Sequence, residues 1–270
     1  PSLFTDAVTQ VASAAGRDDT LPMLTGVNFA INGANIKLAA TDRFRLAIRE
    51  LSWEPVSDNV NAKLLVPAKT LQENARSLDT SLDQPVQIAV GTEDNVGAEG
   101  LFGLHSHNRE TTTRMLDADF PNVAPLLPKA HTSMATVEVA PLLEAIRRVS
   151  LVADRNAQLR MHFKPGQVTL YSSGADSGAA EETLDAAFTG ADELLIAFNA
   201  GYLRDGLVDT GMHAERQAIA QRIDVSNDFV HRGLEAHHVQ HGAEDLLAQV
   251  GNALELEGHR PDLPRQRLGH

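Results

Sequence analysis

Ten consecutive residues decide the fold of this chain: Leu38-Ala39-Ala40-Thr41-Asp42-Arg43-Phe44-Arg45-Leu46-Ala47. Apolar side chains alternate along residues 36–40 and again along residues 44–48, which is typical of two half-buried strands. The polar pair Thr41-Asp42 indicates a turn between them, because such side chains hydrogen-bond to nearby backbone groups. We expect Phe44, Leu46 and Ile48 on the apolar face of the second strand, and Arg43, Arg45 and Arg49 on the opposite face.

A third strand precedes this pair. Val27, Phe29 and Ile31 alternate in the same way, and Asn32-Gly33 is typical of a tight hairpin leading to Ile36. The three strands therefore predict an antiparallel meander.

Composition limits the classes of function that this chain can have. The 270 residues are 43% hydrophobic and carry a net charge of −13, which disfavours nucleic-acid binding except through a local basic stripe. The absence of cysteine excludes disulfides, thiolate metal ligands and cysteine nucleophiles. No apolar run is long enough for a membrane span and no signal peptide is evident, so we expect a cytoplasmic protein without a membrane partner. A first residue of Pro1 indicates a fragment or a processed product.

The same order of elements occurs twice along the chain. Amphipathic helices are predicted over residues 3–15 and after Pro141, and second helices over residues 67–78 and 199–207. Matching positions recur at a nearly constant spacing: Phe29 and Phe163, Gly33 and Gly166, Ile36 and Val168, Val66 and Ala197. A repeat of about 130 residues predicts an α+β fold, in which helices back an antiparallel sheet in each copy.

The character of the sequence changes after Leu207. Seven of the eleven histidines lie in residues 208–270, and nothing there resembles the strands expected between Val86 and Met115. We interpret 208–270 as an atypical His-rich tail that results from an altered reading frame or from replacement by unrelated sequence.

Several motifs resemble one family, the bacterial sliding clamps, which are the beta subunits of the DNA polymerase III holoenzyme. They are Leu21-Pro22-Met23-Leu24-Thr25-Gly26-Val27, Ala40-Thr41-Asp42-Arg43-Phe44-Arg45-Leu46-Ala47, Thr112-Thr113-Arg114, Asp119-Phe120-Pro121 and Leu127-Pro128-Lys129. The resemblance covers residues 1–207 and is actinobacterial in character. It implies the DNA-clamp fold, with the clamp middle domain over residues 1–129 and an incomplete third domain over 130–207. By this resemblance we expect the first domain and the C-terminal end of the third to be missing from these 270 residues.

The resemblance implies a processivity factor rather than an enzyme. Clamps of this family form a head-to-tail homodimeric ring, which encircles duplex DNA without reading its sequence. They dock DNA polymerase III alpha, clamp-loader subunits and repair polymerases through short peptides. The missing domains place ring closure in this chain in question. No cofactor, metal or catalytic residue is expected.

Two sets of residues carry these expectations by position in the family. The partner-peptide pocket is expected at Leu24, Thr41, Arg43, Phe44, Arg45, Leu46, Pro121, Pro125 and Leu126. Its opposite wall is expected from the missing C-terminal strand. DNA is expected to face Arg17, Lys69, Arg76, Arg148, Arg155 and Arg204. For each residue the alternative is an ordinary core or surface role.

Two alternative hypotheses for the function of the whole chain stay open. A defective clamp fragment without function is one of them. A metal-binding enzyme is the other, because His237 and His241 have the spacing of two ligands on one helix face. Asp117 and Asp119 lie two residues apart, but no partner base or metal motif accompanies them, so we interpret them as turn residues.

Overall fold

The computed structural model describes residues 1–217, apart from the short segments 57–59, 79–80, 82–83, 92–99, 108, 128–132, 155–157 and 175–177. Within 209–217 it describes the backbone alone. The chain folds into two units with separate hydrophobic cores. Short 3₁₀ turns, η1 (Pro22–Leu24), η2 (Ala124–Leu126) and η3 (Ser150–Val152), lie between the main elements.

The first unit is a helix-backed antiparallel sheet with an added hairpin layer. Its elements are α1 (Ser2–Ala12), β1 (Gly26–Asn32), β2 (Asn35–Thr41), β3 (Leu46–Ser52), β4 (Asn61–Pro67), α2 (Ala68–Arg76), β5 (Gln87–Val90), β6 (Leu101–Ser106) and β7 (Arg109–Arg114). The main sheet has the strand order β3-β2-β1-β4, and β5-β6-β7 forms a second sheet.

The second unit repeats this plan. Its elements are β8 (Met134–Thr136), α3 (Val139–Val149), β9 (Leu159–Lys164), β10 (Gly166–Gly174), β11 (Gly178–Thr189), β12 (Leu194–Phe198) and α4 (Ala200–Gln217). The sheet order is β12-β9-β10-β11-β8. In this sheet β11, β10, β9 and β12 follow one another as β3, β2, β1 and β4 do in the first sheet, and β8 is added beside β11. The predicted α+β repeat is therefore confirmed.

Strand pairing fixes the repeat length more sharply than the sequence does. Ile31 pairs with Ile36 across the first hairpin, and Phe163 pairs with Val168 across the second. Ile31 and Phe163 are therefore separated by the same number of residues as Ile36 and Val168. Leu64 and Ile196, on the strands that flank these hairpins, are separated by that interval too. Phe29 therefore corresponds to Met161, and the predicted match of Phe29 with Phe163 is wrong.

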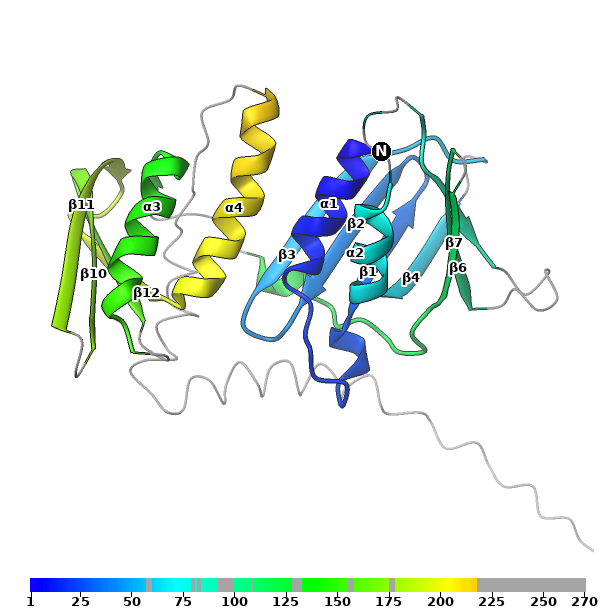
Figure 1. Ribbon diagram of the computed structural model, residues 1–270, viewed down its shortest axis with the longest axis horizontal. Coiled ribbons are helices and arrows are strands. Elements are labelled where there is room, and N and C mark those ends of the chain that lie inside the picture. The colour runs from blue at the N-terminus through cyan, green and yellow to red at the C-terminus, as the bar shows by residue number, and fades with distance from the viewer. Residues whose placement is uncertain are drawn as a thin grey trace, which may run out of the picture.

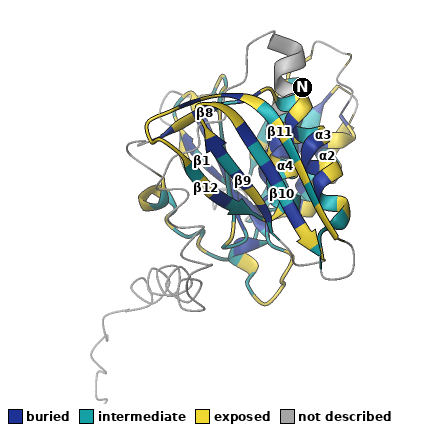
Figure 2. Cartoon of the chain, turned by 90° about the vertical axis from the view of Figure 1, so that its left-hand side faces the viewer, coloured by how far each residue is buried: buried dark blue, intermediate teal, exposed yellow. Residues whose placement is uncertain are grey.

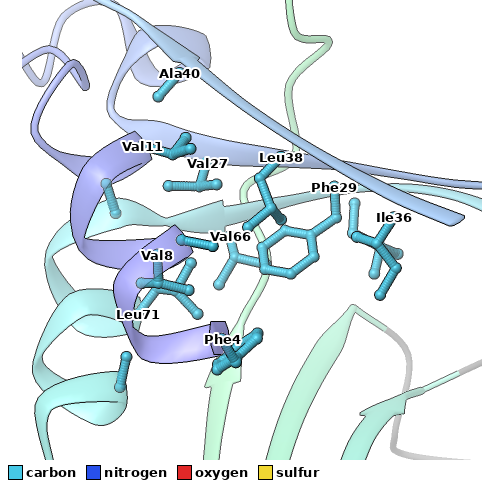
Figure 3. Close-up of a cluster of buried hydrophobic side chains, with 14 of the residues drawn as sticks. Phe4, Val8, Val11, Val27, Phe29, Ile36, Leu38, Ala40, Val66 and Leu71 are labelled. Carbon is cyan, nitrogen blue, oxygen red and sulfur yellow. The ribbon is translucent and has the colours of Figure 1, made fainter. Parts of the chain in front are cut away.

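Aliphatic and aromatic side chains from helices and strands fill the first core. Val8 and Val11 of α1 and Leu71 of α2 point onto the apolar face of β1 and β2 (Figure 3). Phe29 lies at the centre of this core, and its ring centroid is 5.3 Å from that of Phe102 on β6. The spacing of the apolar residues along α1 explains its formation, because it places one stripe on the sheet.

The helices of the two units lie together. In Figure 1, α4 of the second unit stands next to α1 of the first, with α3 and α2 on the outer sides, and direct packing joins each neighbouring pair. The second sheet faces the viewer in Figure 2, and its buried residues alternate with exposed ones along the strands. Each sheet therefore has one face on its helices and one face away from them.

The faces of β3 differ from the prediction. Residues directly opposite in an antiparallel pair share a face, and Leu38 of the core lies opposite Arg49, while Thr41 lies opposite Leu46. Arg49 is thus on the helix side, whereas Leu46 and Ile48 are on the other side. The turn occupies residues 42–45, so Phe44 is not part of the strand alternation that the prediction assumed.

Helix boundaries also shift. α1 ends at Ala12, ahead of the predicted end at Ala15, and α3 begins at Val139, ahead of Pro141. The short strand predicted at Val137 and Val139 is β8, which ends at Thr136. α4 starts directly after Asn199, close to its predicted start, but continues to Gln217.

We expect the two cores to respond separately to mutation. Phe29→Ala should lower the free energy of unfolding of the first unit by about 3–5 kcal/mol, because it removes a fully buried ring and leaves a cavity. Trp53, the single tryptophan of the chain, packs against the first core, so its fluorescence in a urea titration reports this unit.

The corresponding change in the second core is Met161→Ala, which should lower the free energy of unfolding of the second unit by about 2–5 kcal/mol. Circular dichroism should report this loss, and the urea midpoint of the Trp53 fluorescence should not change. Val56→Ala, at a fully exposed position, is the control and should change stability by less than about 0.5 kcal/mol. Equal shifts of the tryptophan signal in both core variants would show that the units unfold together.

Candidate functional site

A cleft lies where the two units meet. Its volume is about 560 Å³, within the range of small-ligand and peptide-anchor sites. Three parts of the chain line it: the segment after α1, the turn between β2 and β3, and the first turns of α4. The lining residues are Ala15, Gly16, Arg17, Asp18, Leu21, Leu24, Asp42, Arg43, Phe44, Arg45, Asn199, Gly201, Tyr202 and Asp205.

The turn between β2 and β3 is held by its own side chains. Oδ1 of Asp42 accepts hydrogen bonds from the backbone N–H groups of Phe44 (3.1 Å) and Arg45 (3.0 Å). Oγ1 of Thr41 donates to the Arg45 carbonyl at 2.7 Å and accepts from the Arg43 N–H at 3.3 Å. These bonds explain why short polar residues occupy this corner. They hold Arg43 in a left-handed backbone conformation, with φ of 80°.

Arg45 joins the two units. Its Nε is 3.0 Å from Oδ2 of Asp42, and its Nη1 is 3.0 Å from Oδ2 of Asp205 on α4. The guanidinium also lies over the ring of Tyr202, 4.5 Å from the centroid, in cation–π geometry. Because the Arg45 side chain is only 20% exposed, these contacts are partly shielded from water. One side chain thus connects the turn of the first unit to the first turns of α4.

The start of α4 is fixed by a cap. Oδ1 of Asn199 accepts a hydrogen bond from the Tyr202 N–H at 3.1 Å, as an N-cap side chain does. This cap orients the first turns of the helix, so that Tyr202 and Asp205 reach Arg45.

Asp18 lines the cleft from the segment after α1. Its carboxylate accepts hydrogen bonds from Thr20, through Oγ1 at 2.6 Å and the backbone N–H at 3.0 Å. These bonds hold the pKa of Asp18 below its usual value, with a smaller contribution from the charge of Arg43. Asp18 therefore stays ionised, and its hydrogen-bonding capacity is partly used.

Four of the nine residues expected at the peptide pocket line this cleft: Leu24, Arg43, Phe44 and Arg45. Thr41 is buried behind them and supports the turn, and Leu46 begins β3. Pro121, Pro125 and Leu126 lie in the segment after β7 and are absent from the lining. A peptide-binding role for the nine residues stays a prediction.

The start of α4 forms the wall of the cleft on the side of the second unit, through Asn199, Gly201, Tyr202 and Asp205, and none of these four residues is among those expected at a binding site. That a C-terminal strand completes the peptide pocket stays a prediction. Residues 160 positions apart meet here, and no local sequence pattern announces such a contact. The repeat offered the only hint, since α4 occupies the place of α2 in the second unit.

The six residues expected to face DNA fall into four groups, the last of which is Arg148 alone. Lys69 and Arg76 on α2 and Arg204 on α4 are exposed on the helices. Arg17 lines the cleft instead, because α1 ends at Ala12 and residue 17 lies in the following loop. Arg155 falls outside the described residues.

Arg148 is held by the second sheet. Its Nε is 3.0 Å from Oε2 of Glu182 on β11, its Nη2 contacts the other oxygen, and Glu144 lies 3.6 Å away. A bidentate pair of this kind fixes the guanidinium in place. The bond from Arg148 is also the main reason why the pKa of Glu182 lies below its usual value. Contact with a DNA phosphate would have to compete with this pair.

In the described part of the chain, no group of three His, Asp or Glu side chains could hold a metal ion. His237 and His241 lie outside the described residues. Asp117 is exposed in the bend after β7, as expected for a turn residue. None of the described helices is long and apolar enough to cross a membrane.

Comparison with known proteins gives one consistent result. The family model for the central domain of the DNA polymerase III beta subunit matches residues 1–122, and the model for its C-terminal domain matches residues 124–216. Beta sliding clamps from Streptomyces coelicolor and Micrococcus luteus are 46% and 42% identical, over 76% and 67% of this chain.

Solved structures agree with these relatives. The DNA polymerase III subunit beta of Pseudomonas aeruginosa matches with a TM-score of 0.70 and 25% identity, over 78% of this chain and 55% of its own. The sliding clamp of Bacillus subtilis matches with a TM-score of 0.69 and 26% identity, over 77% of this chain and 53% of its own. The chain spans about half the length of the curated relatives it matches, 53% and 56% for the two named above.

A double-mutant cycle can measure the link that Arg45 forms. Combining Arg45→Met with Asp205→Asn should give a coupling energy of about 1 kcal/mol in urea unfolding, because the pair is partly buried and hydrogen-bonded. The exposed pair Lys37–Glu50 is the matched control, and Lys37→Met with Glu50→Gln should couple by less than about 0.5 kcal/mol. Equal coupling in both cycles would remove the special role of Arg45.

The Arg148–Glu182 pair predicts a pH effect. Because the folded pKa of Glu182 is lowered, its contribution to the unfolding free energy is present above the usual glutamate pKa and disappears as the pH falls through the lowered value. NMR titration of the Glu182 carboxyl should show a midpoint that rises when Arg148 is changed to Met. An unchanged midpoint would contradict the contact.

Proposed function

The chain belongs, over residues 1–216, to the DNA polymerase III beta subunit family, and on that premise we propose that it forms part of a sliding clamp. In this proposal it performs no bond chemistry. It contributes two clamp repeats to a cytoplasmic ring that keeps the replicative polymerase on duplex DNA.

The observation that carries the proposal is the common helix layer of the two repeats. Both units have the same strand order, and α4 packs on α1, so α3, α4, α1 and α2 follow one another along one side (Figure 1). Sliding requires contact with phosphates and no reading of bases, and a layer of helices with exposed cations can provide this.

Local charge supports this use of the helix layer despite the net charge of −13. Lys69, Arg76 and Arg204 are exposed on helices. The only salt bridge that any of the three forms within the described residues joins Arg204 to its neighbour Asp205, at 3.5 Å. A few exposed cations of this kind suit weak, sequence-independent attraction to DNA.

The cleft supports the second part of the proposal, which is docking of protein partners. Leu21 and Leu24 give it apolar surface, and charged groups surround them. Such a site suits an extended peptide that inserts one apolar side chain. We propose that polymerase, clamp-loader and repair proteins dock here through short peptides.

The resemblance to sliding clamps implies a homodimeric ring, and in the proposal these residues supply two of its repeats.

The DNA part predicts a specific salt dependence. Lys69→Gln with Arg76→Gln should weaken binding of the full chain to a 30-base-pair duplex. It should also reduce the slope of log K against log salt by about 1 to 2, because up to two phosphate contacts are lost. Fluorescence anisotropy at several salt concentrations measures both quantities.

The control removes two cations from the other side of the molecule. Arg160→Gln with Lys164→Gln changes exposed residues on β9 that alternate with the core residues Met161 and Phe163. This variant has the same net charge as the helix variant and should keep the original slope. Equal losses in the two variants would place DNA elsewhere than on the helices.

A further inference from the structure

The outer face of the second sheet carries two stripes of opposite charge. This face is turned toward the viewer in Figure 2, and its residues alternate along each strand with those of the core. Arg160 and Lys164 form a basic stripe on β9, Glu181 and Asp185 form an acidic stripe on β11, and all of them are exposed. β10 lies between the stripes, and the outward residues that separate them are uncharged: Gln167, Thr169 and Tyr171.

The hydrogen-bonded register places the two stripes in step. Arg160 and Glu181 lie opposite one and the same residue of β10, and so do Lys164 and Asp185. Neighbouring strands are about 4.8 Å apart, so about 10 Å separates each cation from the anion of its row. That is too far for an ion pair, and none of these residues forms one within the described part of the chain. Each row therefore has a cation at one end and an anion at the other, both without a charged partner.

The row between these two is already paired within the chain. His162 lies between the two cations of β9, and its Nε2 is 3.0 Å from Oε2 of Glu193. In the same row, the hydroxyl groups of Thr169 and Thr183 are hydrogen-bonded to each other at 3.0 Å. The charges that remain for another molecule are consequently those of the two outer rows.

This pattern is complementary to itself in one orientation. When two copies face each other about a two-fold axis along β10, the strand direction is retained and the two sides of the sheet exchange places. β9 of one copy then lies over β11 of the other, with Arg160 against the partner's Glu181 and Lys164 against the partner's Asp185. Stacked sheets are about 10 Å apart, a gap that these side chains bridge from both sides. An axis across the strands would set cations on cations, so charge selects the first arrangement.

We propose that the outer face of the second sheet is an interaction surface for a second copy of this chain, which binds face to face in an isologous contact. The proposal goes beyond the clamp ring, because a head-to-tail ring joins two different surfaces, whereas this contact joins one face to itself. It therefore connects separate rings. The acidic stripe repels polyanions such as DNA and anionic membranes, so the observations favour a copy of the chain as the partner.

The contact is expected to be weak and sensitive to salt. Its charged residues are exposed, so each ion pair contributes little and is screened by dissolved ions. Sedimentation velocity of the wild-type chain should show reversible self-association at high protein concentration. The dissociation constant should rise about tenfold between about 50 and about 500 mM NaCl.

Charge reversal of the stripes tests which residues make the contact. Arg160→Glu with Lys164→Glu makes both stripes acidic, and Glu181→Lys with Asp185→Lys makes both basic. Each variant should raise the dissociation constant at least about tenfold, because attractive contacts become repulsive. Reversal of both stripes together exchanges them and should restore the wild-type constant within about threefold. A mixture of the wild-type chain and this doubly reversed chain should form no mixed dimer, since like charges then face each other.

The matched control changes the net charge elsewhere. Lys69→Glu with Arg76→Glu, on α2, alters the net charge by the same amount as the acidic variant and should retain wild-type association. Circular dichroism verifies the fold of every variant, and the exposed positions of the substitutions should leave it intact.

Several outcomes would overturn the proposal. One is a wild-type chain whose sedimentation does not depend on protein concentration or salt, and another is an equal loss of association in the α2 control, which would assign the effect to net charge. A third is a folded, doubly reversed chain that does not associate or that forms mixed dimers with the wild type. Self-association that the stripe variants leave unchanged would assign the contact to another surface. In all these cases the proposed clamp function stands, because it does not require this face.

Discussion

Arg45 makes the contacts on which the cleft depends. It pairs with Asp42 beside it in the turn and with Asp205 on α4, and its guanidinium stacks on Tyr202. Each unit has its own core, but the distance between the turn and α4 depends on contacts between the units. Because both of its ion pairs are partly shielded, Arg45 is a fixed part of the wall of the cleft.

The turn combines rigidity with one unfavourable residue. Asp42 and Thr41 use their side chains to order residues 42–45, which gives Arg45 its direction and forces Arg43 into a left-handed conformation. Glycine adopts this conformation without strain, whereas the side chain of an arginine disfavours it.

The two repeats share their strand arrangement but differ in charge at equivalent positions. Leu38 pairs with Arg49 in the first sheet, and Leu170, its counterpart in the second sheet, pairs with Glu182. Arg49 and Glu182 thus hold equivalent places with opposite charge, and Glu182 binds Arg148 of α3. Hydrophobic positions on the strands set the register in both units, so polar positions between helix and sheet can diverge. A basic residue on a helix is consequently a poor guide to DNA contact until its partner is known.

The sequence by itself determined the two-unit α+β plan, the helices, the hairpin at Gly33 and the polar corner at Thr41–Asp42, because periodicity and turn chemistry are local properties. It also placed Leu24, Arg43, Phe44 and Arg45 at one site, through their resemblance to a family. It put Leu46 and Ile48 on the wrong face, since the length of a turn decides which side follows. Only the tertiary structure showed that α4 closes the cleft and that Arg45 reaches Asp205, because that contact joins residues 160 positions apart.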